Sequence, residues 1–176
     1  MRARVIASIL LAAAVVAAAP AVAKPRGDDK DRKSKNGHAE GSLGGVKVTI
    51  EYGRPSVKGR KIWGDLVPYD KVWRTGADEA TTIAFDKDVM VEGQRLAAGT
   101  YAFFAIPTPG GWTAIFNKTA DQWGAFDYDA KSDALRVTVQ PKAHEMVETL
   151  EYAVGADGFE LRWEKLAVPV AVKPAS

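Results

Sequence analysis

The residue types best suited to binding chemistry are gathered in residues 52–85, with one further aromatic residue downstream. The predicted ligand-binding residues are Arg54, Lys58, Arg60, Trp73, Arg74 and Trp123. A guanidinium group binds a carboxylate, phosphate or sulfate through two parallel hydrogen bonds, and an aromatic face beside it stacks on sugars or other rings. We therefore expect this stretch to bind a small anionic or carbohydrate ligand, or a cell-envelope polymer of the same chemistry.

The same residues also permit a structural interpretation. In it, Trp63 and Trp73 fill the core, and the arginines form salt bridges across a long loop. Long loops need such contacts, because buried polar groups are costly when they have no partner. A structural envelope protein without a ligand is therefore an alternative to the binding module.

Two adjacent acids, Asp78 and Glu79, are the candidate catalytic residues of a further alternative, a hydrolase with one of them as general base. Adjacent side chains of an extended strand point to opposite sides, so the two acids could act together only on a loop. The simpler interpretation is that one of them pairs with Arg74 or Arg54 and fixes the loop. We therefore favour a binding module over an enzyme.

Other catalytic and metal chemistry has little support in the sequence. The chain has no cysteine and only two histidines, His38 and His144, which cannot supply a zinc-binding cluster. Ser56 lies in the segment GRPSV, which lacks the glycine of a nucleophile elbow. Asp127 and Asp129 have the spacing of calcium ligands, but a lysine follows at the next alternate position, which favours a charged turn. We predict no metal and no cofactor.

Most of the elements that position these residues are predicted from alternation of apolar and polar side chains, which is typical of half-buried strands. Residues 99–106 are apolar on both faces, as in a central strand. The predicted strands include residues 46–52, 81–85, 89–91, 99–106, 112–116, 126–128, 135–139, 146–154, 159–163 and 168–172, the last placed at a sheet edge because it contains Pro169. Short strands at such intervals predict an all-β fold, an antiparallel β-sandwich (immunoglobulin-like or jelly-roll-like) of about eight or nine strands. Four glycines and two prolines interrupt residues 52–85, which predicts one long ordered loop insertion.

The N-terminal region predicts export. Residues 1–23 combine two arginines, an apolar run of 15 residues and an A-x-A sequence, as in a secretory signal peptide. The run is shorter than the ~20 residues that span a bilayer, so we expect no transmembrane anchor after cleavage. Residues 24–42 are rich in charge and glycine and predict a disordered linker, and residues 43–174 predict a single β-sandwich domain. The expected location is periplasmic or secreted.

The charge balance excludes one class of partner. Of the 24 basic residues two lie in the predicted signal peptide, which leaves 22 against 22 acidic residues. A chain of zero formal charge has no overall field that would hold nucleic acid, so we expect no nucleic-acid partner. Any anion site must be local.

Several longer motifs resemble those of a known family. They are YGRPSVKGR at residues 52–60, VWRTGA at 72–77, AGTY at 98–101 and QWG at 122–124. Together they resemble the exported bacterial domain-of-unknown-function family 2911, over roughly residues 45–152. The resemblance implies an exported β-rich domain and no assigned activity. The chain departs from that pattern at Asp78, where the resemblance leads us to expect asparagine.

Overall fold

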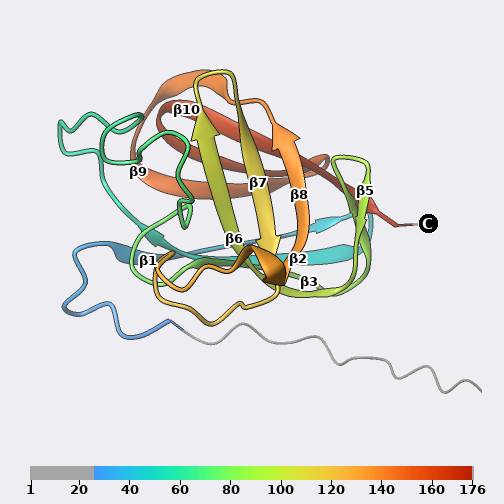
Figure 1. Ribbon diagram of the computed structural model, residues 1–176. Helices are drawn as coiled ribbons and strands as arrows, with labels where there is room; N and C mark the ends of the chain where they lie inside the picture. Colours follow the sequence, from blue (N-terminus) through green and yellow to red (C-terminus); the bar gives the residue numbers. More distant parts are fainter. Residues whose placement is uncertain (1–25, 176) are drawn as a thin grey trace, which may run out of the picture.

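Two antiparallel β-sheets face each other in the computed structural model, which describes residues 26–175 (Figure 1). The first sheet has the order β1-β2-β3-β6-β7-β8, with β1 (Lys35–Leu43), β2 (Val46–Arg54), β3 (Thr81–Phe85), β6 (Gly99–Thr108), β7 (Gly111–Asn117) and β8 (Asp133–Val139). The second has the order β5-β4-β10-β9, with β4 (Val89–Val91), β5 (Gln94–Leu96), β9 (Lys142–Gly155) and β10 (Gly158–Pro174). The prediction of an antiparallel β-sandwich is confirmed, with ten strands in the described part rather than eight or nine.

The alternating sequence pattern determines which side of each strand faces the core. In β2, Val46, Val48 and Ile50 are buried while Lys47 is exposed. Strand β6 is buried on both sides because Phe103 belongs to the main core, whereas Phe104 lies in a smaller cluster on the other face of the sheet. A loop at residues 118–132 covers this smaller cluster, where the rings of Tyr128 and Phe104 lie 5.1 Å apart.

Strand β1 corrects the prediction of a disordered linker at residues 24–42. It pairs with β2 along its whole length, from Lys35 opposite Arg54 to Leu43 opposite Val46. The sequence suggested disorder because the segment has few large apolar side chains, but its glycines permit close packing instead. A Cβ atom on Gly37 would lie 2.5 Å from the ring of Tyr52. Main-chain pairing thus orders a segment that side-chain hydropathy marked as a linker.

Residues 1–25 lie outside the described residues, and the predicted signal peptide lies among them. Between residues 26 and 175, no helix has the length and hydropathy needed to cross a bilayer.

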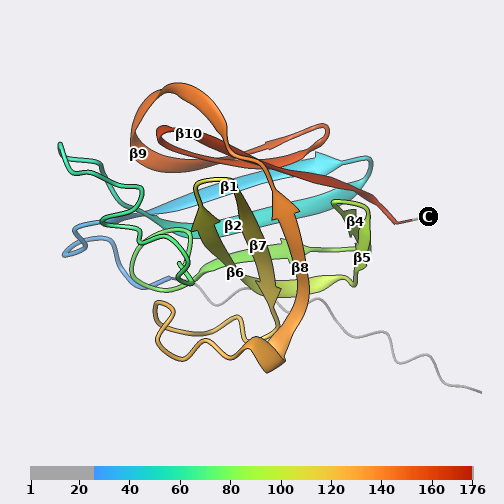
Figure 2. The same cartoon turned by 45° about the horizontal axis from the view of Figure 1, so that its top comes forward.

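The insertion after β2 is tied to both sheets, and Figures 1 and 2 show it in teal and green at one end of the sandwich. Near its start, the amide of Val57 donates to the carbonyl of Glu148 in β9 at 2.8 Å. Near its end, the amide and carbonyl of Trp73 bond to the carbonyl and amide of Ala105 in β6, at 2.8 and 2.9 Å. The loop is therefore a fixed part of the fold.

Two further strand predictions are wrong. Pro169 does not lie in an edge strand, because β10 lies between β4 and β9. Proline has no amide hydrogen to donate to a neighbouring strand, but none is needed at this position. The pairing of β10 with β9 ends at Ala167, and its pairing with β4 begins at Val172. Phe126 is in the loop between β7 and β8 and is 83% exposed, so it is not a strand residue facing a core.

Candidate functional site

An unusual turn at Thr75 sets the direction of Arg74. Thr75 is buried and has φ +52°, a left-handed conformation that a β-branched residue rarely adopts. Its hydroxyl donates to the carbonyl of Phe103 at 2.9 Å, and its own carbonyl accepts from the hydroxyls of Thr81 at 3.1 Å and Tyr152 at 2.9 Å. Such strain persists only where surrounding contacts hold it, and it concentrates at functional positions.

The two longest family-like motifs meet directly beside this turn. A Cβ atom on Gly53 would lie 2.3 Å from the carbonyl oxygen of Ala77, and one on Gly76 would lie 3.0 Å from the carbonyl oxygen of Gly53. Glycine at both positions lets the start and the end of the insertion pack backbone against backbone. The insertion therefore closes on itself, with Arg74 at the point of closure.

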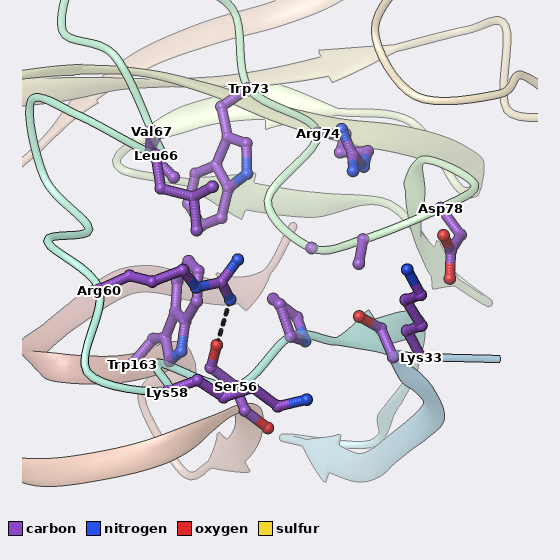
Figure 3. A pocket seen from close by; sticks show the side chains of 14 residues that line it. Lys33, Ser56, Lys58, Arg60, Leu66, Val67, Trp73, Arg74, Asp78 and Trp163 are labelled. Carbon is purple, nitrogen blue, oxygen red and sulfur yellow. Dashed lines mark hydrogen bonds between the residues drawn. The ribbon is translucent and has the colours of Figure 1, made fainter.

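A cavity of about 440 Å³ opens beside the closed insertion (Figure 3). Its charged lining residues are Lys33, Lys58, Arg60, Arg74 and Asp78, and its aromatic ones are Trp73 and Trp163. Figure 3 shows the two indoles on one side of the cavity and Lys33 and Asp78 on the other. Four cations against one carboxylate give this pocket a positive charge, although the chain outside the predicted signal peptide is balanced.

Arg74 is the pocket cation with a buried donor atom that has no acceptor in the described residues. Its Nε atom is buried and has no hydrogen-bond acceptor within residues 26–175, and its guanidinium forms no ion pair with any carboxylate of that range. Burial lowers the pKa of Arg74, and the charge of Asp78 partly opposes that effect. Arginine nevertheless stays protonated at neutral pH, so a charged guanidinium lines the pocket while its buried Nε lacks an acceptor. Leaving such a donor unpaired costs about 1–3 kcal/mol.

Arg60 and Lys58 are positioned by the backbone of the insertion. The Nε of Arg60 donates to the carbonyl of Val57 at 3.1 Å, and a second guanidinium nitrogen donates to the carbonyl of Ser56 (Figure 3). Lys58 has φ +49°, and its amide donates to the carboxylate of Glu148 at 2.8 Å. These contacts fix two positive groups at the pocket without neutralising either side chain.

Trp163 is a pocket residue that the sequence did not reveal. It is 1% exposed, and its indole N–H has no acceptor in the described part of the chain. Its ring stacks on Trp73, with centroids 5.9 Å apart and planes at 19°. The pairing of β10 with β9 shifts register around this residue, and Glu164 has φ +55°. Such a bulge redirects a side chain, which alternation alone does not predict.

The structure brings together four of the six predicted ligand-binding residues: Lys58, Arg60, Trp73 and Arg74. Arg54 does not line the pocket, because its Nε donates to the carbonyl of Leu150 at 3.3 Å and links β2 to β9. Trp123 lines a neighbouring cavity instead. The core interpretation of Trp63 fits its position, since its ring contacts those of Trp73, Trp112 and Trp163 at 4.9–5.7 Å.

The candidate base Glu79 is held in an ion pair. Its carboxylate accepts from Arg26 at 3.0 Å and from two nitrogens of Arg32, at 2.5 and 2.6 Å. Hydrogen bonding to Arg32, assisted by the charge of Arg26, lowers the pKa of Glu79 to about 2. A carboxylate that holds its charge so strongly is a weak proton acceptor at neutral pH. The observed partners differ from Arg74 and Arg54, the partners that the sequence suggested.

Asp78 is also attached to the N-terminal segment. It lies 3.5 Å from Arg32 and has φ +61°, a conformation that aspartate and asparagine tolerate better than most residues. The segment carrying Arg26 and Arg32 runs through residues 26–34 and supplies Lys33 to the pocket. Its contribution was missed because charged, glycine-containing sequences are typical of linkers.

Asp133, at the start of β8, holds the loop at residues 118–132 in place. Asp133 accepts hydrogen bonds from Asn117 at 2.8 Å, Tyr128 at 2.7 Å and Arg136 at 2.6 Å. Burial and the bond to Asp133 raise the pKa of Tyr128 to about 12. Over residues 26–175, no three His, Asp or Glu side chains gather as a metal site would require.

Together these features define a class of protein: a β-sandwich with a cationic, indole-walled pocket under one long insertion. The chain belongs to the family described as "Protein of unknown function (DUF2911)", which matches residues 34–172 and so confirms the family expected from the motifs. The match includes β1 and ends within β10. Comparison with curated proteins and with solved structures gave no match.

Proposed function

We propose that this protein is an exported binding module whose pocket holds the carboxylate or phosphate of a small ligand. The observation that carries the proposal is Arg74, a charged donor beside the cavity whose buried Nε lacks an acceptor within the described residues. A bound anion would pair with the charge of this guanidinium from the side that lines the cavity. Arg74 would hold the anion, with Arg60 and Lys58 adding positive charge at the pocket.

The surroundings of Arg74 suit an anion that carries an apolar or ring-shaped part. Trp73 and Trp163 give one side of the cavity an aromatic surface, and the indole N–H of Trp163 is a second donor without an acceptor in the described chain. Excluding water strengthens the attraction between guanidinium and anion. Hydrolysis is not part of this proposal, because both candidate bases are paired: Glu79 with Arg26 and Arg32, and Asp78 with Arg32 at 3.5 Å.

Export is the second half of the proposal and rests on the sequence of residues 1–23. It places the ligand in the periplasm or outside the cell. The chain has no cysteine, so no disulfide bond supports the pocket. The absence of cysteine does not indicate which compartment the protein occupies.

Thermal unfolding of the purified protein with phosphate, sulfate, citrate and glucuronate, against chloride at equal ionic strength, tests the binding proposal. An anion at 100 times its dissociation constant stabilises a protein by ~2.7 kcal/mol, which raises the midpoint by several degrees. We expect at least one anion to do so for the wild type and not for Arg74→Ala. The matched control is Lys71→Ala, an exposed cation of the same insertion that does not line the pocket.

Arg74→Lys separates two-pronged recognition from charge alone. We expect it to weaken binding at least tenfold in calorimetric titration, because an ammonium group cannot reproduce the planar fork. The proposal fails if no anion raises the unfolding midpoint of the wild type. It also fails if Arg74→Ala still responds to the anions as the wild type and the control Lys71→Ala do.

A further inference from the structure

A second cavity of about 450 Å³ adjoins the Arg74 pocket. The two cavities share Lys33 and Asp78 among their lining residues, so they meet at these side chains. Figure 3 places both residues on the side of the first pocket away from its indoles. The second cavity therefore begins where the first one ends.

Trp123 gives the second cavity an aromatic wall on a backbone that is fixed in place. It is 56% exposed, an unusual state for the largest apolar side chain, yet its backbone is held at both sides. Trp123 forms a β-bridge with Glu79. The amide of Gly124 donates to the carbonyl of Asp78 at 3.0 Å, and the amide of Ala80 donates to the carbonyl of Gln122 at 3.0 Å. Because this backbone is already ordered, binding of a ring to the indole costs only side-chain conformational entropy.

The charges around Trp123 are balanced, in contrast to those of the first pocket. Three carboxylates and three cations line the cavity, among them Asp28, Asp31 and Arg32. Hydroxyl groups both donate and accept hydrogen bonds, so a hydroxylated ring matches a lining of mixed sign. Stacking of its apolar face on Trp123 leaves those hydroxyls directed at the charged rim.

We propose that the two cavities form one groove that recognises an oligosaccharide with an acidic sugar at one end. The carboxylate of the acidic sugar binds at Arg74, and a neutral neighbouring sugar stacks on Trp123. This inference rests on the proposed function, because it assigns the anion to the Arg74 pocket, and it adds the class of ligand and a second subsite.

A nucleotide also combines an anion with a ring, but the groove fits it less well. The balanced charges near Trp123 give no net attraction for further phosphate groups, and only one aromatic residue lines this cavity within the described residues. Adenosine monophosphate is therefore the discriminating competitor in the test.

Calorimetric titration with three sugars and with adenosine monophosphate tests the inference. The sugars are glucuronic acid, the disaccharide of glucuronic acid and xylose, and xylobiose as the neutral control. We expect the acidic disaccharide to bind about tenfold more tightly than glucuronic acid, as one stacked ring allows, and xylobiose to bind more weakly than both. Trp123→Ala should remove the tenfold gain and leave the affinity for glucuronic acid unchanged.

Two variants control for indirect effects. Phe126→Ala removes a more exposed aromatic side chain of the same loop that lines neither cavity, and it should keep the gain. Trp123→Tyr keeps an aromatic ring at this position, so it should retain most of the tenfold gain in affinity that Trp123→Ala removes.

The outcomes separate this inference from the proposed function. If glucuronic acid binds in an Arg74-dependent way but the disaccharide gains nothing, the Trp123 subsite is wrong while the anion pocket stands. Tighter binding of adenosine monophosphate than of the disaccharide also overturns the inference. If glucuronic acid does not bind while phosphate, sulfate or citrate raises the unfolding midpoint through Arg74, the inference fails and the anion pocket stands. If no anion of either panel binds, both proposals fail.

Discussion

Arg26 and Arg74 show how differently one residue type can be used in the same small region. The side chain of Arg26 is 5% exposed and donates to the carbonyls of Ala77, Glu79 and Ala80 and to the carboxylate of Glu79. Arg74 is partly buried and its Nε has no acceptor in the described chain. We interpret Arg26 as a structural residue and Arg74 as a binding residue.

The two arginines should respond in opposite ways to replacement by methionine. Arg26→Met leaves carbonyls and a carboxylate unpaired, so we expect the free energy of unfolding to fall by about 3 kcal/mol. Arg74→Met removes an unpaired buried charge, so we expect a change within about 1 kcal/mol or a gain. Urea unfolding without added ligand measures both, and an equal loss in the two variants would make Arg74 structural.

Glu79 makes stability depend on pH in acid. Its pKa is lowered from 4.5 to about 2, so the folded state holds the ionised form more strongly than the unfolded chain does. The resulting stabilisation is complete above about pH 4.5 and disappears as the pH falls towards about 2. We expect Glu79→Gln to cost about 2 kcal/mol at pH 7, as the loss of charged hydrogen bonds does, and progressively less below pH 4.5.

Chemical unfolding of the wild type and Glu79→Gln from pH 7 to pH 2.5 measures this difference. Asp65→Asn is the control, since Asp65 is exposed and forms no ion pair within the described residues. A gap between wild type and Glu79→Gln that stays constant into acid would contradict the assignment.

At the scale of elements, β1 is the largest departure from what the sequence suggested. It is ordered by pairing with β2 rather than by a hydrophobic face of its own. We expect those amides of β1 that donate to β2 to exchange with deuterium at least 100-fold more slowly than in an unstructured peptide, which corresponds to ~2.8 kcal/mol of opening free energy. Hydrogen exchange with mass spectrometry measures this, and full exchange at the first time point would restore the linker interpretation.

Most of the elements that the sequence did predict share one property: their side chains alternate, whereas β6 was predicted as a central strand that is apolar on both faces. Residues 81–85 and 89–91 are strands with the expected limits, because β-branched and apolar residues there face a core between turns. The insertion was also located correctly, since glycine and proline prevent regular structure. The sequence did not predict the ion-pair partners of the insertion. Arg26 and Glu79, for example, are 53 positions apart, and no local pattern connects them.

Across the whole molecule, the pocket is assembled from segments that are remote in the chain. Lys33 comes from the N-terminal segment, Lys58 to Asp78 from the insertion, and Trp163 from β10. Four of the predicted binding residues lie together because one insertion supplies them all. Trp163 and Lys33 could not be added from the sequence, because a β-bulge and a long-range ion pair bring them there.

The stacked pair Trp73 and Trp163 also has an optical consequence. Two indoles with centroids 5.9 Å apart behave as coupled chromophores, so their electronic transitions mix and give rise to paired circular-dichroism bands of opposite sign. One indole of the pair comes from the insertion and the other from β10. Trp63 and Trp112 lie within 4.9–6.1 Å of rings in the same cluster and couple as well. Undocking of the insertion from β10 would separate Trp73 from Trp163 and so change the shared circular-dichroism signal of the cluster.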